Sequence, residues 1–205
     1  MVGDDEEGEV VVYGVAAIVV IQTINKRQTE QKFFRGHDDD ITCISIEPTN
    51  SSVCRGASGQ LGGGKGACIM VWTVGTQRLL YRCGLGFFER QVQAVQFCGS
   101  SDGNGGHCKY LIGIGGDNSQ TIGIFDLKAV SALDPTNNVK SFEPTSPLLI
   151  ASCGMAPGVP PTVASVCWRP GDANDGGGCF VTLSVGKNLK FWQLVKGENS
   201  SSAWR

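Results

Sequence analysis

The feature that constrains this chain most is a unit of short strands that recurs three times along the sequence. Three apolar segments close on an aromatic residue followed by a polar one: "CIMVWTV" (68–74), "TIGIFDL" (121–127) and "LKFWQLV" (189–195). Each follows a glycine-bearing turn and, further upstream, a segment that stops at a breaker: "ITCISIEP", "VQAVQFCG" and "VASVCWRP". These upstream segments alternate apolar and polar residues, which indicates half-buried strands. A strand unit repeated in this way predicts a β-propeller.

The composition agrees with short strands joined by many turns. Glycine accounts for 29 of the 205 residues, about twice its usual share of ~7%. Charged residues make up 18%, below the usual ~25%. The best helical candidate, Leu127–Leu133, is short and ends at Asp134-Pro135. We therefore expect an all-β fold.

Apolar periodicity places the individual strands, and glycine- and proline-rich stretches separate them. Three longer loops, Gly99–His107, Lys128–Pro147 and Gly154–Pro161, are expected at the surface. Strands are expected at Val10–Tyr13, Ala16–Ile24, Gln31–Phe34, Ile41–Ile46, Val53–Ala57, Cys68–Val74, Arg78–Arg82, Val92–Phe97, Tyr110–Ile114, Thr121–Leu127, Leu148–Ala151, Val163–Trp168, Cys179–Val185 and Leu189–Val195.

Net charge and cysteine spacing weigh against several classes of protein. The formal net charge is −2, which gives no general basis for binding nucleic acid. The nine cysteines include no C-x-x-C pair, which zinc sites usually show, and their odd number argues against a fully paired secreted framework. The longest apolar run, Val10–Ile21, is shorter than the ~20 residues that span a bilayer. A reduced cytosolic protein that binds neither nucleic acid nor membrane is favoured.

The stretch "SGQLGGGKGA" (58–67) resembles a phosphate-binding loop. Gly59, Gly64 and Lys65 fit the pattern G-x-x-x-x-G-K-[ST], but Gly66 stands where a hydroxyl should reach Mg²⁺. A phosphate loop also leads into a helix, whereas the next segment, "ACIMVWTV" (67–74), is typical of a strand. A hairpin loop at the rim of the propeller is therefore favoured over a nucleotide site, and no cofactor is expected.

The titratable side chains give no convincing catalytic or metal site. His37 and His107 are the two histidines of the chain, and spacing alone supports no Ser-His-Asp or Cys-His arrangement. Asp38, Asp39 and Asp40 suggest a cation site, but consecutive side chains diverge, so a solvated turn is the more common outcome. We expect a protein that is not an enzyme and that binds no metal.

Several positions resemble those of WD repeats. Gly36-His37 stands just before an alternating strand, and Trp72 ends the same unit, as the Gly-His opening and Trp-Asp-type ending of a WD repeat do. In WD blades a His, a strand Ser or Thr, a turn Asp and the Trp form a hydrogen-bonded tetrad. This resemblance gives three of those places to His37, Ser58 and Trp72, and the turn Asp is absent. The positions to which the resemblance assigns a structural role are Gly36, His37, Ser58, Trp72, Asp117, Asp126 and Trp192.

Three longer phrases resemble one family more specifically. "QKFFRGHDDDITCISIEP" (31–48), "GLGFFERQVQAVQF" (84–97) and "SVGKNLKFW" (184–192) stand in the order in which similar phrases occur in the echinoderm microtubule-associated protein-like family. "GEVVVYGVAAIVVIQTINKRQTEQ" (8–31) resembles the end of that family's hydrophobic HELP motif and the strands after it. The resemblance covers roughly residues 8–196.

The resemblance also predicts how the chain is organised. It implies an all-β WD-repeat β-propeller with about three and a half blades present, whereas closed propellers use ~4–8. We therefore expect this chain to be a segment of a longer protein and of a larger, tandem propeller. Residues 1–9 are predicted to be an acidic N-terminal segment, 8–196 the propeller segment with the end of a HELP-like motif, and 197–205 a polar tail that adds no outer strand.

The family's properties imply a non-enzymatic protein that binds or stabilises microtubules. Its expected partners are tubulin and other cytoskeletal or axonemal proteins, and its expected location is the cytoplasm and cytoskeleton, including the axoneme of cilia. A WD-repeat adaptor that scaffolds a signalling or ubiquitin-transfer complex is the alternative. Basic residues could face the acidic surface of tubulin, although a solvated rim is the plainer interpretation; the candidates are Lys26, Arg27, Lys32, Arg35 and Arg90.

Overall fold

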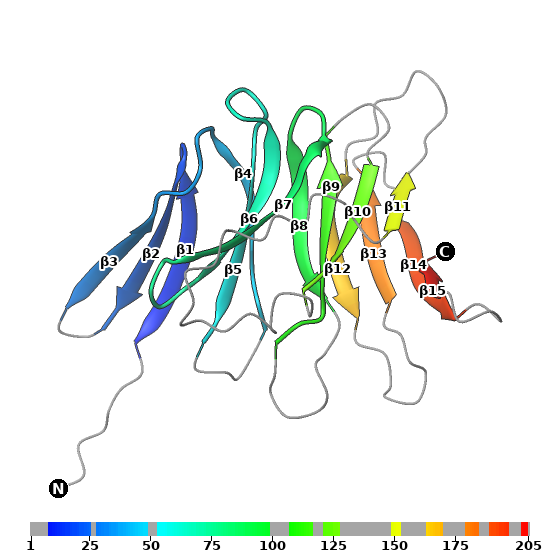
Figure 1. The fold of residues 1–205 in the computed structure, drawn as a ribbon. Helices are drawn as coiled ribbons and strands as arrows, with labels where there is room; N and C mark the ends of the chain where they lie inside the picture. The colour runs from blue at the N-terminus through cyan, green and yellow to red at the C-terminus, as the bar shows by residue number, and fades with distance from the viewer. Residues whose placement is uncertain are drawn as a thin grey trace, which may run out of the picture.

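The computed structural model describes residues 8–25, 28–48, 53–98, 107–116, 121–127, 149–152, 163–169, 179–184, 189–196 and 202–204. In these residues the chain forms fifteen strands and four antiparallel sheets. The sheets follow one another in the order of the sequence, from the blue first sheet to the orange and red fourth (Figure 1). This arrangement confirms the all-β propeller fold expected from the repeats.

Each sheet is a meander in which consecutive strands pair with one another. The first sheet holds β1 (Glu9–Val15), β2 (Ile18–Ile24) and β3 (Thr29–Phe34). The second holds β4 (Ile41–Ile46), β5 (Arg55–Gln60), β6 (Ala67–Thr73) and β7 (Leu79–Phe88). The third holds β8 (Val92–Cys98), β9 (Tyr110–Gly115), β10 (Thr121–Asp126) and β11 (Leu149–Ser152). The fourth holds β12 (Val163–Arg169), β13 (Cys179–Ser184), β14 (Leu189–Lys196) and β15 (Ser202–Trp204).

The core lies between successive sheets, and β6 contributes to two of these interfaces. Met70 and Trp72 pack with Phe34 against the first sheet, whereas Ile69 and Val71 pack toward the third sheet. Successive side chains of a strand point to opposite faces, so a strand between two layers needs an unbroken apolar run. The run "CIMVW" in β6 meets this requirement, and every residue of β6 is buried.

The same aromatic contact recurs between successive sheets. Phe34 at the end of β3 stacks on Trp72 of β6, with ring centroids 5.4 Å apart. Phe88 at the end of β7 packs against Phe125 of β10, with centroids 6.2 Å apart. In both cases the last strand of one sheet contacts the third strand of the next. The first sheet therefore packs on the second through the same strand positions as the second packs on the third.

Strand β7 is longer than the sequence predicted. It was expected to end at Arg82 but continues to Phe88, whose position pairs with Ala67 after a register shift. Gly84 and Gly86 lie within it at φ values of +72° and +78°, a conformation that glycine adopts at little cost. These glycines therefore allow the strand to continue past a bulge. The sequence pattern had predicted that the strand ends there.

Two further predictions about strands need correction. Strand β5 begins at Arg55 and runs to Gln60, so the start of the glycine-rich stretch is strand rather than loop. The segment 197–205 was expected to add no strand, but β15 pairs with β14. Ladder hydrogen bonds use the backbone, so a short polar segment can pair without apolar alternation. Of the helical candidate Leu127–Leu133, only Leu127 lies within the described residues.

Alanine substitutions at the two glycines of β7 separate backbone strain from steric conflict. A Cβ atom at Gly84 would lie 2.3 Å from Cε2 of Phe88, whereas one at Gly86 would meet nothing within 4 Å. Gly86→Ala should lower the free energy of unfolding by about 1–2 kcal/mol, the cost of the left-handed backbone. Gly84→Ala should lower the free energy of unfolding by a further ~1–3 kcal/mol, because the added methyl group overpacks the site. Urea unfolding measures both, and equal losses would contradict the described packing of Phe88.

Candidate functional site: two buried polar networks

The first network joins the β3–β4 connection to the middle of the second sheet. The Nε2 atom of His37 lies 2.6 Å from the hydroxyl oxygen of Ser58 in β5. The indole N–H of Trp72 in β6 donates to the same hydroxyl at 3.0 Å. All three side chains are buried. The structure therefore brings together the three residues that the WD resemblance had grouped.

The hydrogen bonds of Gln60 determine which ring nitrogen of His37 carries the proton. The side-chain amide of Gln60 donates to Oδ1 of Asp38 at 2.7 Å and to the carbonyl of Gly66 at 3.0 Å. Its oxygen, 2.7 Å from Nδ1 of His37, can therefore only accept, so Nδ1 carries the proton and Nε2 accepts from Ser58. Burial lowers the pKa of His37, which favours this neutral ring. Gln60 and Asp38 extend the network in a way the sequence did not suggest.

The glycine-rich loop binds carboxylates of its own chain. The backbone N–H of Gly63 donates to Oδ2 of Asp39 at 2.6 Å, and that of Lys65 donates to Oδ2 of Asp38 at 2.9 Å. The hydrogen bond from Gln60, followed by that from the Lys65 backbone, lowers the pKa of Asp38. The loop leads directly into strand β6 at Ala67. Its amides thus hold the aspartate turn, and this geometry gives a reason for the glycines other than phosphate binding.

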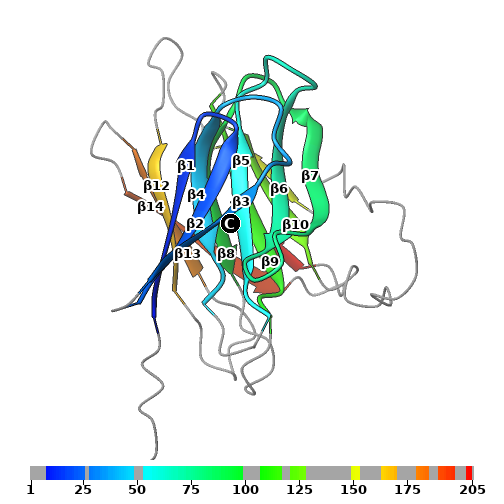
Figure 2. The ribbon, with the colours of Figure 1, turned by 90° about the vertical axis from the view of Figure 1, so that its left-hand side faces the viewer.

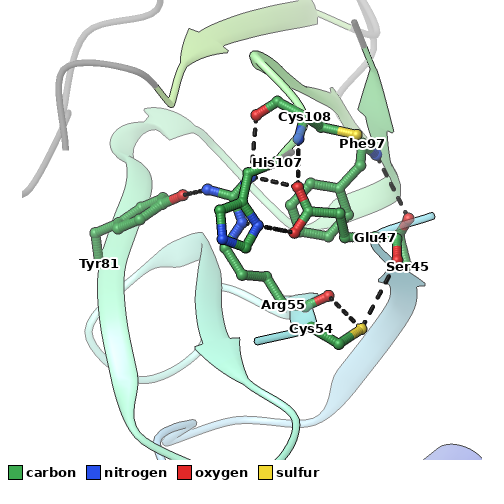
Figure 3. Close-up of polar contacts among 8 residues, drawn as sticks. All are labelled: Ser45, Glu47, Cys54, Arg55, Tyr81, Phe97, His107 and Cys108. Atoms are coloured by element: carbon green, nitrogen blue, oxygen red, sulfur yellow. Dashed lines mark hydrogen bonds and ion pairs between the residues drawn. The ribbon is translucent and has the colours of Figure 1, made fainter. Parts of the chain in front are cut away.

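The second network is a buried ion pair that the sequence did not reveal. Glu47 follows β4, and Arg55 begins β5. Nε of Arg55 donates to Oε2 of Glu47 at 2.8 Å, and Nη2 of Arg55 donates to Oε1 of the same carboxylate. Nη1 of Arg55 also contacts the hydroxyl of Tyr81 at 3.3 Å (Figure 3). Both charged side chains are almost fully buried.

This ion pair also binds the segment that leads into β9 of the third sheet. Nδ1 of His107 lies 2.9 Å from Oε2 of Glu47, and the backbone N–H of Cys108 donates to Oε1. Nη2 of Arg55 donates to the carbonyl of Cys108 at 3.0 Å. Figure 3 shows these groups converging on the carboxylate. The network is therefore a polar link between the second and third sheets.

The electrostatics of Glu47 favour its charged form. Burial alone would raise the pKa of this carboxyl, but the hydrogen bond and charge of Arg55, with help from His107 and the Cys108 backbone, lower it below its ordinary value. A buried carboxylate with a guanidinium partner is a structural pair rather than a poised acid. Among the described residues, no group of three or more His, Cys, Asp or Glu side chains could hold a metal ion.

The remaining predicted positions are not part of either network or lie outside the described residues. A Cβ atom at Gly36 would lie 2.4 Å from Cζ of Phe34, so this position needs glycine. Asp126 ends β10 and Trp192 lies in β14. Asp117, Lys26 and Arg27 fall outside the described residues.

The basic residues that are described lie near the ends of outer strands. Lys32 in β3 is half exposed and forms an ion pair with Glu30 at 3.6 Å. The guanidinium of Arg35 stacks on the ring of Phe33, 5.3 Å from its centroid. Arg90 is exposed, and its carbonyl accepts the N–H of Gly62 at 2.8 Å. In the part of the chain that the structure describes, no helix is long and apolar enough to cross a membrane.

A double-mutant cycle tests the shared hydroxyl of Ser58. Ser58→Ala and Trp72→Phe should each lower the free energy of unfolding by about 1–3 kcal/mol, because the first leaves the buried Trp72 N–H without an acceptor and the second leaves the buried Ser58 oxygen without that donor. The combined loss should fall short of the sum by ~0.5 kcal/mol or more, since both changes break one contact. Thr29→Ala with Trp72→Phe is the additive control. Additivity in the Ser58 pair, measured by urea unfolding, would contradict this hydrogen bond.

The ion pair predicts a defined dependence of stability on pH. The folded-state pKa of Glu47 lies below its ordinary 4.5, so its stabilisation is present above that value and disappears as pH falls through the folded-state pKa. Glu47→Gln should lower the free energy of unfolding by about 3 kcal/mol at neutral pH, because Arg55 remains buried without a counter-charge.

Unfolding free energies of the wild type and Glu47→Gln, measured from about pH 7 to about pH 3, check this prediction. Their difference should shrink below the ordinary pKa of the carboxyl. Glu89→Gln, at an exposed glutamate after β7, is the matched control and should change little. A difference that stays constant with pH would show that Glu47 is not charged in the folded protein.

Comparisons with known proteins bear on the family. No family model matches the chain. Mouse echinoderm microtubule-associated protein-like 2 is 30% identical over 156 residues, which are 70% of this chain and 22% of that protein. Mouse echinoderm microtubule-associated protein-like 1 is 28% identical over 155 residues, 70% of this chain and 18% of that protein. The chain thus spans about a fifth of the length of the curated relatives it matches.

A further relative agrees with these matches, and a solved structure shares the fold. The 77 kDa echinoderm microtubule-associated protein of Strongylocentrotus purpuratus is 28% identical over 62% of this chain and 18% of its own length. A WD40 propeller in a crystal structure of the mitotic checkpoint complex matches with a TM-score of 0.54 at 17% identity, over 90% of this chain and 47% of that chain. The solved structure supports the fold alone, whereas the curated relatives confirm the resemblance drawn from the sequence: the chain is similar, over 70% of its length, to the echinoderm microtubule-associated protein-like family.

Proposed function

We propose that this chain is a non-enzymatic, microtubule-associated WD-repeat protein that binds or stabilises microtubules. The observation that supports the proposal is the similarity to relatives named for microtubule association over 70% of the chain. A cytoskeletal location follows from the same proposal, with the axoneme as one such site.

Charged side chains around one rim offer a surface for tubulin. The β3–β4 connection, the glycine-rich loop and the β7–β8 connection lie together, because Asp39 binds Gly63 and Gly62 binds Arg90. Arg35 begins the first of these connections, and Arg90 lies in the middle of the last. Both are exposed, and Arg35 is held over the half-exposed ring of Phe33. We assign Arg35, Arg90 and the neighbouring Lys32 to contact with the acidic surface of tubulin.

Cosedimentation with taxol-stabilised microtubules tests both parts of the proposal. The full chain should pellet with microtubules, and binding should weaken as salt rises, because exposed charges are screened within ~10 Å at 0.1 M ionic strength. Charge reversal at Arg35 and Arg90 (Arg35→Glu with Arg90→Glu) should reduce the pelleted fraction several-fold. Arg78→Glu is the matched control, since this exposed arginine lies in the β6–β7 turn at the other end of β6.

The outcomes distinguish a wrong assignment of the binding surface from a wrong proposal of microtubule binding. Binding that is equally reduced by Arg78→Glu would overturn the assignment of the rim while leaving microtubule association intact. Failure of the unmodified chain to pellet at low salt would overturn the proposed function and favour the adaptor alternative. Circular dichroism of each variant confirms that a loss of binding does not reflect unfolding.

A further inference from the structure

Arg82, in the outermost strand of the second sheet, carries a donor that nothing in the described part of the chain satisfies. Its Nε atom is closed to solvent and has no hydrogen-bond partner. Its guanidinium also forms no ion pair with any described residue. A guanidinium keeps its positive charge in a protein, and buried polar groups without a partner are rare in native structures. Packing within the described protein therefore does not account for this charge.

Arg82 faces the gap between the first and second sheets. In the register of the second sheet it stands directly opposite Met70 of β6, and opposite residues of an antiparallel pair share one face. Met70 packs with Phe34 of the first sheet, and a Cβ atom at Gly36 would lie 3.0 Å from its Sδ. Burial is the main cause that lowers the pKa of His37, and the nearby charge of Arg82 lowers it further. Arg82 thus lies at the outer end of this gap, beside the β3–β4 connection.

The carboxylates of the neighbouring elements are bound to other groups. Glu30 in β3 forms an ion pair with Lys32 at 3.6 Å. Asp38 in the β3–β4 connection accepts from the side chain of Gln60 at 2.7 Å. In the described part of these elements, therefore, no carboxylate supplies the counter-charge of Arg82.

Arg55, the buried arginine of the same sheet, shows which ligand such a side chain takes. Its Nε and Nη2 atoms donate to the two oxygens of the Glu47 carboxylate. A carboxylate presents two acceptors that match the spacing of these two donors, so the pair is both strong and specific in geometry. Arg82 has the same donors, but its Nε atom lacks the acceptor that Arg55 finds in its own sheet.

The surroundings of Arg82 favour a carboxylate carried on a polypeptide over a free one. A single guanidinium near the surface gives a free carboxylate little affinity, whereas one held on a chain by further contacts has a high effective concentration. We propose that Arg82 is a binding site for the carboxylate of an aspartate or glutamate side chain in an acidic segment of a partner protein. The side chain of Arg82 is partly exposed, and its long stem can turn about its own bonds to meet the ligand. The proposal does not depend on microtubule binding.

Replacement of Arg82 distinguishes a binding residue from a structural one. Arg82→Met removes a charge without a partner and keeps much of the apolar stem, so the Tm of the full chain without ligand should be unchanged or higher. Arg55→Met is the matched control, and it should lower the Tm clearly because Glu47 remains buried without its counter-charge. Any measurable fall of the Tm in Arg82→Met would overturn the proposal, since Arg82 would then stabilise the fold itself.

Binding is tested by NMR of the full chain with isotope-labelled arginine, through the Nε–H signal of Arg82, which Arg82→Met identifies by its loss. The probe is a hexaglutamate peptide with blocked ends, and sodium acetate at the same ionic strength is the comparison. The peptide should shift this signal saturably, at a carboxylate concentration about tenfold lower than acetate requires. The signal of Arg78, an exposed arginine in the β6–β7 turn, should not move. No shift with the peptide, equal shifts of both arginines, or acetate as effective as the peptide would each overturn the proposal.

Discussion

The structure depends on face-to-face packing of successive sheets through aromatic side chains. Phe34 against Trp72 and Phe88 against Phe125 repeat one contact at two interfaces. Each contact joins the outermost strand of one sheet to the third strand of the next, so it sets both the spacing and the offset of neighbouring layers. Offset aromatic pairs are favourable beyond the area they bury. The glycines opposite these rings follow from the same requirement, because a side chain at Gly36 or Gly84 would strike Phe34 or Phe88.

Polar contacts then fix the relative position of neighbouring sheets, which apolar packing alone would allow to shift. Apolar surfaces tolerate sliding, whereas the Glu47 carboxylate accepts from Arg55 in its own sheet and from Cys108 at the start of the next. Desolvation of both charges offsets much of the attraction between them, so such a pair adds little net stability. Its contribution is positional, since a shift of the third sheet would break the hydrogen bonds that Cys108 makes with Glu47 and Arg55. The His37 network acts similarly between the β3–β4 connection and β5.

The repeats predicted most of the strands, because each unit contains a segment of alternating apolar and polar residues that ends at a glycine or proline. Prediction from the sequence failed for hydrogen bonds between residues that are far apart in the chain and that only the fold brings together. Cys108 and Glu47 are separated by 61 positions, and no local pattern connects them. The expected turn Asp of the WD tetrad was absent, yet Gln60 reaches Nδ1 of His37 from the strand instead. Glycines misled twice in the same direction: Gly84 and Gly86 lie within a strand that they were expected to follow, and Gly59 lies in β5 rather than in a loop.

The glycine-rich loop illustrates one physical rule, that backbone groups without partners in a sheet need partners elsewhere. Amides of Gly63 and Lys65 find them in Asp39 and Asp38, so a sequence resembling a phosphate loop is already satisfied by the chain's own carboxylates. The hydrogen bonds of this loop thus depend on two aspartates that the sequence alone placed in a solvated turn.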